Sequence, residues 1–362
     1  MKVLHLTINM FTGGAQKLLL DMLPKLNKET ITSDLYVMNS KPFAFMQQAQ
    51  EQKVYKVFTS GSQSVYHIIH IFKLIPFFKK YDVLHVHLFP AFYFAVIAKI
   101  ISFSKIKLVY TEHSVTNKRR NNWFFRQIEK FFYKAYHQII CISDEVKMQL
   151  QKDLNIPEGK LRIIINGINI DNYRKAKPYD KSIFFKEDIT TVVIQVASFI
   201  YPKDPITLIR SFKYLPDNYG LLLVGIGKDF NKSVSLVNEL RLENRIKFLR
   251  QREDVPALLK TANTIVLSSL HEGLSLSCIE AMASKRAFIA TNSPGIRDVV
   301  EDGAILVPQK DAKKLAETIQ YIYENKTERL ELIQRAKLQA NKYDINEMRK
   351  SYYKLYKQIV SN

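Results

Sequence analysis

The sequence predicts an α/β protein with two Rossmann-like domains that face each other across a cleft. Short apolar runs, typical of buried parallel strands, alternate with segments of helical spacing along nearly the whole chain. The alternation pauses once, in a stretch rich in Lys, Tyr and Asp, and then resumes. A chain of 362 residues is also too long for one ordinary core, which favours two domains.

The first domain is predicted over residues 1–172. An apolar run at residues 2–8 leads into a turn with Gly13 and Gly14 and then a helical pattern, the usual opening of a nucleotide-type α/β domain. These glycines do not complete the G-x-G-x-x-G pattern of dinucleotide sites. Further strands are expected at residues 34–38, 54–57, 83–87, 107–111, 138–142 and 162–165.

A linker is expected over residues 173–188 and a second domain over residues 189–344. Strands of this domain are expected at residues 191–197, 220–224, 245–248, 264–267, 287–290 and 304–307. Residues 345–362 have helical spacing, and we expect this helix to return to the first domain. Ligands of such sheets bind at the carboxyl ends of the strands, so the site is expected there.

The net charge of +20 is unusually high, and residues 1–170 contribute +12 of it. Nucleic acid and an anionic membrane surface are both possible partners for such a field. Two cysteines, one in each predicted domain, favour a reducing compartment over a disulfide framework. The first residues lack the pattern of a secretory signal, and no apolar run is long enough to cross a membrane.

The segment 271–303 carries the clearest functional pattern. Gly273 follows Glu272 where the chain can approach a ligand closely, and Ser275 and Ser277 lie where they can cap the next helix. The start of that helix offers amide groups and partial positive charge to a phosphate. Glu280, about two turns further on, is placed to accept hydrogen bonds from sugar hydroxyls. One segment can therefore hold the phosphates and a ribose of a nucleotide.

This segment, EGLSLSCIEAMASKRAFIATNSPGIRDVVEDG, resembles the E-x7-E region of the family 4 retaining glycosyltransferases of GT-B fold. Shorter motifs support the resemblance over nearly the whole chain, in the order of that family. They are Gly13-Gly14-Ala15, Thr111-Glu112-His113, Asn166-Gly167-Ile168, Tyr201-Pro202-Lys203-Asp204 and Leu223-Val224-Gly225-Ile226-Gly227.

The resemblance implies transfer of a sugar from a nucleotide sugar, with retained anomeric configuration and without a required metal or other cofactor. It implies that Glu280 binds the ribose, Glu272 lies by the donor sugar and Lys203 neutralises the diphosphate. His113 would face the reacting sugar. The remaining donor-binding positions would be Gly14, Ser198, Gly225, Gly273, Leu274, Ser275 and Leu276.

One position departs from the family pattern. An Arg usually stands five residues before the Lys, and Ser198 occupies that place here. A Ser hydroxyl can donate a hydrogen bond to phosphate but brings no charge. The departure puts donor affinity in question, and Arg250 or Arg252 are candidates to replace the missing cation.

A basic, aromatic tract follows His113. Lys118, Arg119 and Arg120 are assigned to the acceptor or membrane side. Helical spacing in the next segment predicts that Phe124, Ile128, Phe131 and Ala135 face the core, while Arg126, Lys130 and Lys134 form a basic stripe. An ordinary solvated face and nucleic-acid binding are alternatives. We favour docking to an anionic membrane leaflet, because no nucleic-acid-binding motif is present.

His85 and His87 share one face of a predicted strand. A metal site needs more ligands than the sequence places beside them, so no metal is predicted and His87 is assigned to the acceptor side.

These observations predict a cytoplasmic enzyme, peripheral to the inner leaflet of the plasma membrane. It would move a hexose or N-acetylhexosamine from a UDP- or GDP-sugar to a glycan acceptor, polyprenyl-diphosphate-linked, in surface polysaccharide synthesis. A nucleotide-sugar 2-epimerase, a non-catalytic partner subunit and a nucleic-acid-binding protein are the alternatives.

Overall fold

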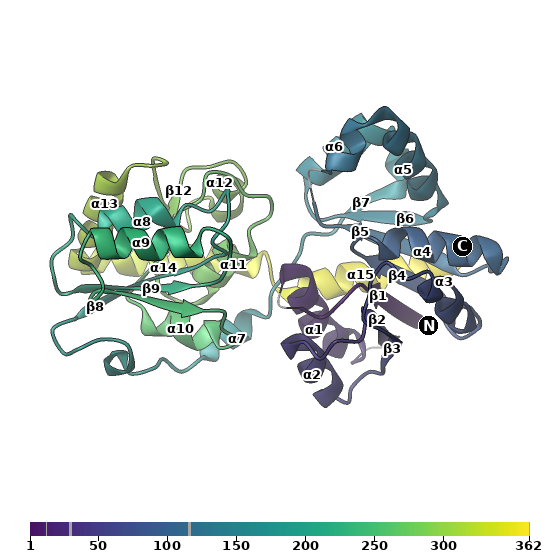
Figure 1. Ribbon diagram of the computed structural model, residues 1–362, viewed down its shortest axis with the longest axis horizontal. Coiled ribbons are helices and arrows are strands. Elements are labelled where there is room, and N and C mark those ends of the chain that lie inside the picture. The colour runs from purple at the N-terminus through teal and green to yellow at the C-terminus, as the bar shows by residue number, and fades with distance from the viewer. Residues whose placement is uncertain (12, 29–30, 115–116, 362) are drawn as a thin grey trace. The chain divides into compact units, whose positions relative to one another are not determined.

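The computed structural model describes residues 1–11, 13–28, 31–114 and 117–361. It consists of two compact units (Figure 1). The first unit comprises Met1–Gly167 and Ile345–Asn362, and the second comprises Ile168–Asp344. Each unit is a parallel sheet with helices on both faces, so the predicted fold class of two Rossmann-like domains is confirmed.

The first unit contains a seven-stranded sheet in the order β3-β2-β1-β4-β5-β6-β7. Its strands are β1 (Lys2–Thr7), β2 (Thr32–Asn39), β3 (Val57–Ser62), β4 (Val83–His87), β5 (Lys107–Glu112), β6 (Gln138–Cys141) and β7 (Leu161–Ile163). The strand expected at residues 54–57 begins three residues later. Val54 is half exposed, and the edge strand β3 pairs irregularly with β2 near its end.

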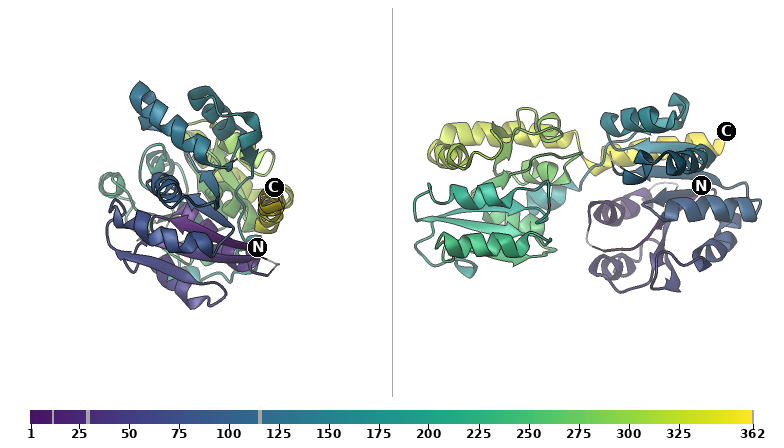
Figure 2. Two further views of the ribbon diagram at one scale, coloured as in Figure 1. Left: turned by 90° about the vertical axis from the view of Figure 1, so that its right-hand side faces the viewer. Right: turned by 45° about the horizontal axis from the view of Figure 1, so that its top comes forward.

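Helices cover both faces of this sheet (Figure 2). They are α1 (Gly14–Leu26), α2 (Ala44–Glu51), α3 (Ile69–Leu74), α4 (Ala91–Ile101), α5 (Trp123–Ala135), α6 (Asp144–Leu154) and α15 (Ile345–Ser361), with short 3-10 turns η1 (Ile75–Lys79), η2 (Lys118–Asn121) and η3 (Glu158–Lys160). Helices α1, α2 and α15 share one core with Val3 of β1, Val83 of β4 and Val109 of β5. Apolar residues of α15, among them Tyr352 and Leu355, hold the end of the chain in this unit.

The second unit contains a six-stranded sheet in the order β10-β9-β8-β11-β12-β13. Its strands are β8 (Thr191–Val196), β9 (Tyr219–Val224), β10 (Ile246–Arg250), β11 (Thr264–Leu267), β12 (Ala287–Thr291) and β13 (Ile305–Val307). Helices α8 (Pro205–Ser211), α9 (Phe230–Glu239) and α13 (Ala312–Glu324) cover one face. The other face is covered by α7 (Ile170–Lys175), α10 (Val255–Thr261), α11 (Leu276–Ala283), α12 (Ile296–Val300) and α14 (Lys326–Asn341), and η4 (Lys181–Ile183) precedes β8.

The boundary between the units differs from the expected linker. Residues 173–188 lie within the second unit, which begins at Ile168. Ile170, Tyr173 and Phe185 are buried in its core, because the segment before β8 packs on α10 and α11. The stretch is polar in overall composition, but its few apolar side chains anchor it.

Strand order reverses once in each sheet. In the first unit the chain builds outward from β1 to β3 and then places β4 on the other side of β1. In the second unit the same reversal separates β8 from β11. Such topological switch points open a crevice at the carboxyl ends of the strands, where α/β proteins bind ligands. No helix among the described residues is long and apolar enough to cross a bilayer.

Candidate functional site

Polar groups gather at the switch point of the second unit, in the loops that follow β8 and β11. The hydroxyl of Ser268 donates to the backbone oxygen of Asp204 at 2.6 Å, and the side-chain oxygen of Gln195 accepts from the amide of Ser268 at 2.9 Å. The Asp204 amide in turn donates to the backbone oxygen of Ser268 at 2.9 Å. These buried bonds fix the two loops together and set the position of Lys203.

Lys203 and Glu272 form an ion pair at this switch point. The Lys203 side chain is 16% exposed and that of Glu272 is 11% exposed, so water screens the pair only in part. The resemblance implies that both residues lie at the donor, and the structure brings the two side chains together. The arrangement presents one cation and one carboxylate at the carboxyl edge of the sheet, each able to take a new partner.

Gly295 holds the loop of Glu272 in place. Its φ is +77°, and a Cβ atom there would lie 2.0 Å from the backbone oxygen of Glu272. The Glu272 amide donates to the backbone oxygen of Pro294 at 3.2 Å. Sequence reasoning gave Gly295 no role, although its Ser-Pro-Gly turn was a usable signal.

Helix α11 begins at Leu276, directly after this loop. Ser275 is its N-cap and has extended backbone, but its side chain makes no capping hydrogen bond, contrary to the expectation for this serine. The first turn of α11 therefore keeps backbone amides for another acceptor. Gly273 and Leu274 lead into this turn and are partly buried.

Glu280 lies further along α11. Its Oε1 accepts a hydrogen bond of 2.7 Å from the hydroxyl of Tyr173, a buried residue of α7. The two residues are 107 positions apart, and no local pattern links them, so sequence reasoning missed Tyr173. The tyrosine fixes the carboxylate that was assigned to a ribose.

The loops after β8 and β9 approach each other at Gly225. Its φ is +143°, and a Cβ atom would lie 2.1 Å from the backbone oxygen of Ala197. Ser198 follows in the same loop and is partly buried. Of the two arginines considered as replacements for its missing charge, Arg252 is paired with Asp254 at 2.6 Å, and Arg250 lies over the ring of Phe230 at 5.0 Å.

In the first unit, three predicted residues lie at or near the carboxyl edge of the sheet. Gly14 is the exposed first residue of α1, after β1. His87 ends β4 and is buried, and His113 directly follows β5. Burial lowers the pKa of His113 to about 4 and that of His87 well below its usual range, so both imidazoles are neutral at physiological pH.

The arginines of η2 do not form an exposed basic site, contrary to expectation. Arg120 is 2% exposed and donates to Glu112 at 2.5 Å, and its Nε donates to Glu129 at 3.3 Å. Arg119 is partly buried and donates to Glu129 at 2.8 Å. Two carboxylates inside the unit attract these guanidinium groups, because a buried charge needs a partner. The side chain of Lys118 lies outside the described part of the structure.

Helix α5 is turned opposite to the predicted orientation. Glu129 and Tyr133 are its buried residues, whereas Phe124 and Phe131 are 61% and 59% exposed. The ion pairs of Glu129 hold this face inward and leave the aromatic stripe in solvent. Trp123 and Phe125 extend the exposed aromatic surface.

Three histidines of the first unit have ring nitrogens within 4.8 Å of one another: His5, His85 and His87. His5 is the third imidazole that the sequence did not place beside the pair on β4. Both nitrogens of His85 are already engaged, by the hydroxyls of Tyr356 at 2.6 Å and Thr111 at 2.7 Å. No carboxylate belongs to this group of described residues, so a divalent cation there would keep its full charge in a buried place.

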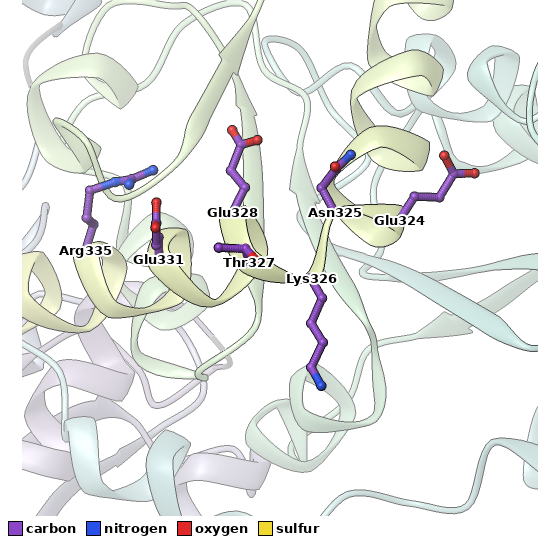
Figure 3. Close-up of a pocket in the computed structure, with 7 residues that line it drawn as sticks. All are labelled: Glu324, Asn325, Lys326, Thr327, Glu328, Glu331 and Arg335. Carbon is purple, nitrogen blue, oxygen red and sulfur yellow. The ribbon is translucent and has the colours of Figure 1, made fainter.

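A pocket lies at the corner between α13 and α14 and is lined by polar and charged side chains (Figure 3). Its side chains fan outward, and Lys326 points away from Glu324 and Glu328. A polar corner without converging groups gives no specific ligand chemistry, so the two switch points remain the candidates.

Comparison with known proteins gives consistent matches. Residues 12–172 match the family described as Glycosyltransferase Family 4, and residues 178–339 match Glycosyl transferases group 1. A relative from Campylobacter jejuni, N,N'-diacetylbacillosaminyl-diphospho-undecaprenol alpha-1,3-N-acetylgalactosaminyltransferase, is 28% identical over 64% of this chain and 63% of its own length. The UDP-Gal:alpha-D-GlcNAc-diphosphoundecaprenol alpha-1,3-galactosyltransferase of Escherichia coli is 25% identical over 65% of this chain and 64% of its own length.

The chain thus spans a little under two thirds of the length of these two relatives. Two solved structures share the fold along both full chains. Anabaena Alr3699/HepE in complex with UDP-glucose has a TM-score of 0.81, 20% identity and coverage of 99% of each chain. A glycosyltransferase from Rickettsia africae has a TM-score of 0.82, 19% identity and coverage of 100% of this chain and 99% of its own.

Proposed function

This chain belongs to the family 4 glycosyltransferases of GT-B fold, and we propose that it moves a hexose or N-acetylhexosamine from a UDP- or GDP-sugar to a glycan acceptor with retained anomeric configuration. The observation that carries the proposal is the Lys203–Glu272 pair beside the open first turn of α11. A diphosphate needs a cation and amide donors, and a sugar needs a carboxylate that accepts from its hydroxyls.

The ion pair gives the crevice a charge-balanced state before the donor binds. When a diphosphate arrives, Lys203 exchanges Glu272 for phosphate oxygens, and Glu272 is released to accept hydrogen bonds from the sugar. The α11 amides add donors at the same place. Charge that develops on the leaving diphosphate is thereby stabilised where it appears.

Glu280 is proposed to accept hydrogen bonds from the ribose, in the orientation set by Tyr173. His113 is proposed to hydrogen-bond a hydroxyl of the reacting sugar. Because Ser198 brings no charge, Lys203 carries most of the positive charge at the diphosphate. No step in this scheme uses a metal, so we expect activity to survive a chelator.

The acceptor is proposed to be a polyprenyl-diphosphate-linked glycan, as the names of the two relatives suggest for those proteins. Such an acceptor lies in a membrane, and the first unit offers a surface for it. The exposed aromatic side chains of α5 lie on the same helix as Lys130 and Lys134. Partial burial, and then the charges of Lys107 and Lys160, lower the pKa of Lys99, which indicates that these three lysines form a second basic group.

Aromatic rings enter the interface of a bilayer and lysines attract anionic lipid headgroups. We propose that α5 docks on the anionic inner leaflet and that the enzyme works in the cytoplasm on surface polysaccharide. The fully buried Arg120 has no part in this surface.

The test is donor binding by the purified protein against a panel of UDP- and GDP-sugars, measured by calorimetry. We expect one nucleotide class to bind and Glu280→Ala to weaken it. Incubation of the bound donor without acceptor then separates a transferase from a 2-epimerase, which would change the donor itself. A folded protein that binds no donor would overturn the proposal in favour of a non-catalytic partner.

A further inference from the structure

Three histidines of the first unit lie in series across three neighbouring strands. The Nδ1 atom of His5 on β1 is 3.2 Å from Nε2 of His87 on β4. The Nδ1 atom of His87 is 3.5 Å from Nε2 of His113, which follows β5. We call these residues the histidine series. It starts at the β1/β4 switch point and ends at the histidine assigned to the reacting sugar.

The series couples the protonation of its members. A neutral imidazole has one N–H donor and one bare acceptor nitrogen, so each link needs one proton and one lone pair. Only two arrangements satisfy both links. In one, His5 donates from Nδ1 to His87 and His87 donates from Nδ1 to His113, so that His113 carries its own proton on Nδ1. In the other, His113 donates from Nε2 to His87 and His87 donates from Nε2 to His5, so that His5 carries its own proton on Nε2.

The environment of His5 decides between the two arrangements. Its Nε2 atom is buried and has no hydrogen-bond partner among the residues that the structure describes. Among buried backbone groups, an N–H without an acceptor is rarer than a carbonyl that lacks a donor, and we apply the same preference to the ring nitrogens of His5. Nε2 of His5 is therefore the bare nitrogen, and its proton lies on Nδ1, where it can be donated to His87.

We propose that His5 and His87 are positioning residues that hold His113 in its neutral Nδ1–H tautomer. His113 then presents an N–H donor, and no basic nitrogen, at the carboxyl edge of the sheet. The inference rests on the proposed function, in which His113 meets a sugar hydroxyl. It assigns to His113 the stabilisation of a sugar oxygen and excludes the role of general base.

The surroundings keep the series neutral. The rings of His85 of β4 and Tyr356 of α15 contact His5, and the ring of Tyr352 of α15 contacts His85. The charges that act on the pKa of His87 come from other histidines, and burial is the larger cause of its low value. An extra proton would find no compensating carboxylate among these groups, so the tautomer and not the charge is what the series controls.

The first experiment needs no substrate and no variant. Nitrogen NMR of the full chain with labelled histidine distinguishes protonated from bare ring nitrogens and assigns each tautomer. We expect Nδ1 of His5, His87 and His113 to carry the proton at neutral pH. A proton on Nε2 of His113, or a charged His113, would overturn the proposal.

Variants test the link to catalysis. His5→Leu removes the donor to His87 and frees the tautomer of His113, so kcat should fall about tenfold, while the Kd of the bare nucleoside diphosphate, which lacks the sugar, should not change. His5→Asn keeps an N–H near the position of Nδ1 and should restore most of the loss. The exposed His67→Leu is the matched control. Equal losses in the Leu and Asn variants would show that His5 is only structural.

The NMR result and the donor Kd are independent, so failure of the series and failure of the proposed function are distinguishable. Zinc is added in a separate arm, because His5, His85 and His87 are close enough to share an ion. Stoichiometric zinc retained after desalting, with shifted nitrogen signals for these three rings, would replace the hydrogen-bonded series by a metal site.

Discussion

The exchange proposed for Lys203 makes an unusual prediction for Glu272→Gln: the variant should bind the bare nucleoside diphosphate more tightly than the natural protein. In the natural protein Lys203 must leave Glu272 before it can bind phosphate. Gln keeps the size of the side chain and removes the competing charge. The sugar should lose affinity at the same time, since a neutral amide oxygen is a weaker acceptor for its hydroxyls.

The size of the gain follows from the burial of the pair. Two unit charges about 4 Å apart interact by roughly 4 kcal/mol at an effective dielectric constant of about 20. Partial exposure, 16% for Lys203 and 11% for Glu272, and side-chain ordering reduce this value. We expect a net coupling of about 1.5 kcal/mol between Lys203 and Glu272, a value between those of exposed and of fully buried ion pairs. This coupling corresponds to a roughly tenfold lower Kd for the nucleoside diphosphate in the variant.

Calorimetry with UDP or GDP, whichever the donor panel identifies, and with the matching nucleotide sugar measures both effects. Lys203→Met should weaken both ligands, by about 1.5–3 kcal/mol for a lost charge-assisted bond. Glu301→Gln is the matched control, because it removes one carboxylate from an exposed pair with Lys342 in the same unit. If Glu272→Gln weakens the bare nucleoside diphosphate as Lys203→Met does, the exchange does not occur.

Four other predictions follow from single contacts. Gly295→Ala should lower the stability of the second unit by about 2 kcal/mol or more and weaken donor binding, because the new Cβ meets the backbone of Glu272. Thermal unfolding measures the loss of stability. The control is Gly159→Ala, because no atom lies within 4 Å of a Cβ added there. Tyr173→Phe should weaken the nucleotide by about 1 kcal/mol without loss of fold, as calorimetry would show, and an unchanged Kd would separate Glu280 from the ribose. Phe124→Ser with Phe131→Ser should abolish binding to anionic vesicles while thermal stability is kept, and the fluorescence of Trp123, the single tryptophan, reports the docking. Acid should destabilise the first unit, because burial lowers the pKa of His5 to about 3 and that of His113 to about 4. Between pH 6.5 and those values the unfolded chain binds more protons than the folded chain. The free energy of unfolding therefore falls as the pH falls. Unfolding curves measured across this pH range should show that the free energy of unfolding of His5→Leu falls less steeply with pH than that of the natural protein. An equal dependence on pH would refute the role of His5 in the acid destabilisation.

The fold could be predicted from the sequence because its signals are local. Strands such as β9 and β11 are buried on both faces, so each reads as a nearly continuous apolar run between turns. Strand order carries no such signal. The two reversals, at β1/β4 and β8/β11, depend on which side of the sheet a helix crosses, and they decide where the crevices lie.

Part of the candidate site could be read from the sequence for the same reason. The segment from Glu272 to Glu280 is contiguous, whereas Tyr173 and His5 reach their partners from distant parts of the chain. For helix α5, the sequence predicted the wrong buried face. Its apolar spacing indicated a core face, but Glu129 is drawn inward by two arginines from the preceding turn. Periodicity reports that two faces differ, and ion pairs here decide which one is buried.

The two units place different chemistry at the same topological position. At the β8/β11 switch point, Lys203 and Glu272 keep part of their contact with water and so can hold full charges. At the β1/β4 switch point, His5 and His87 are buried, and burial without a carboxylate leaves them neutral. Charged groups suit a diphosphate that gains charge as it leaves, and neutral donors suit a sugar whose hydroxyls must not lose protons. Under the proposed function, this difference in burial would suit the second unit to the leaving group and the first unit to the sugar.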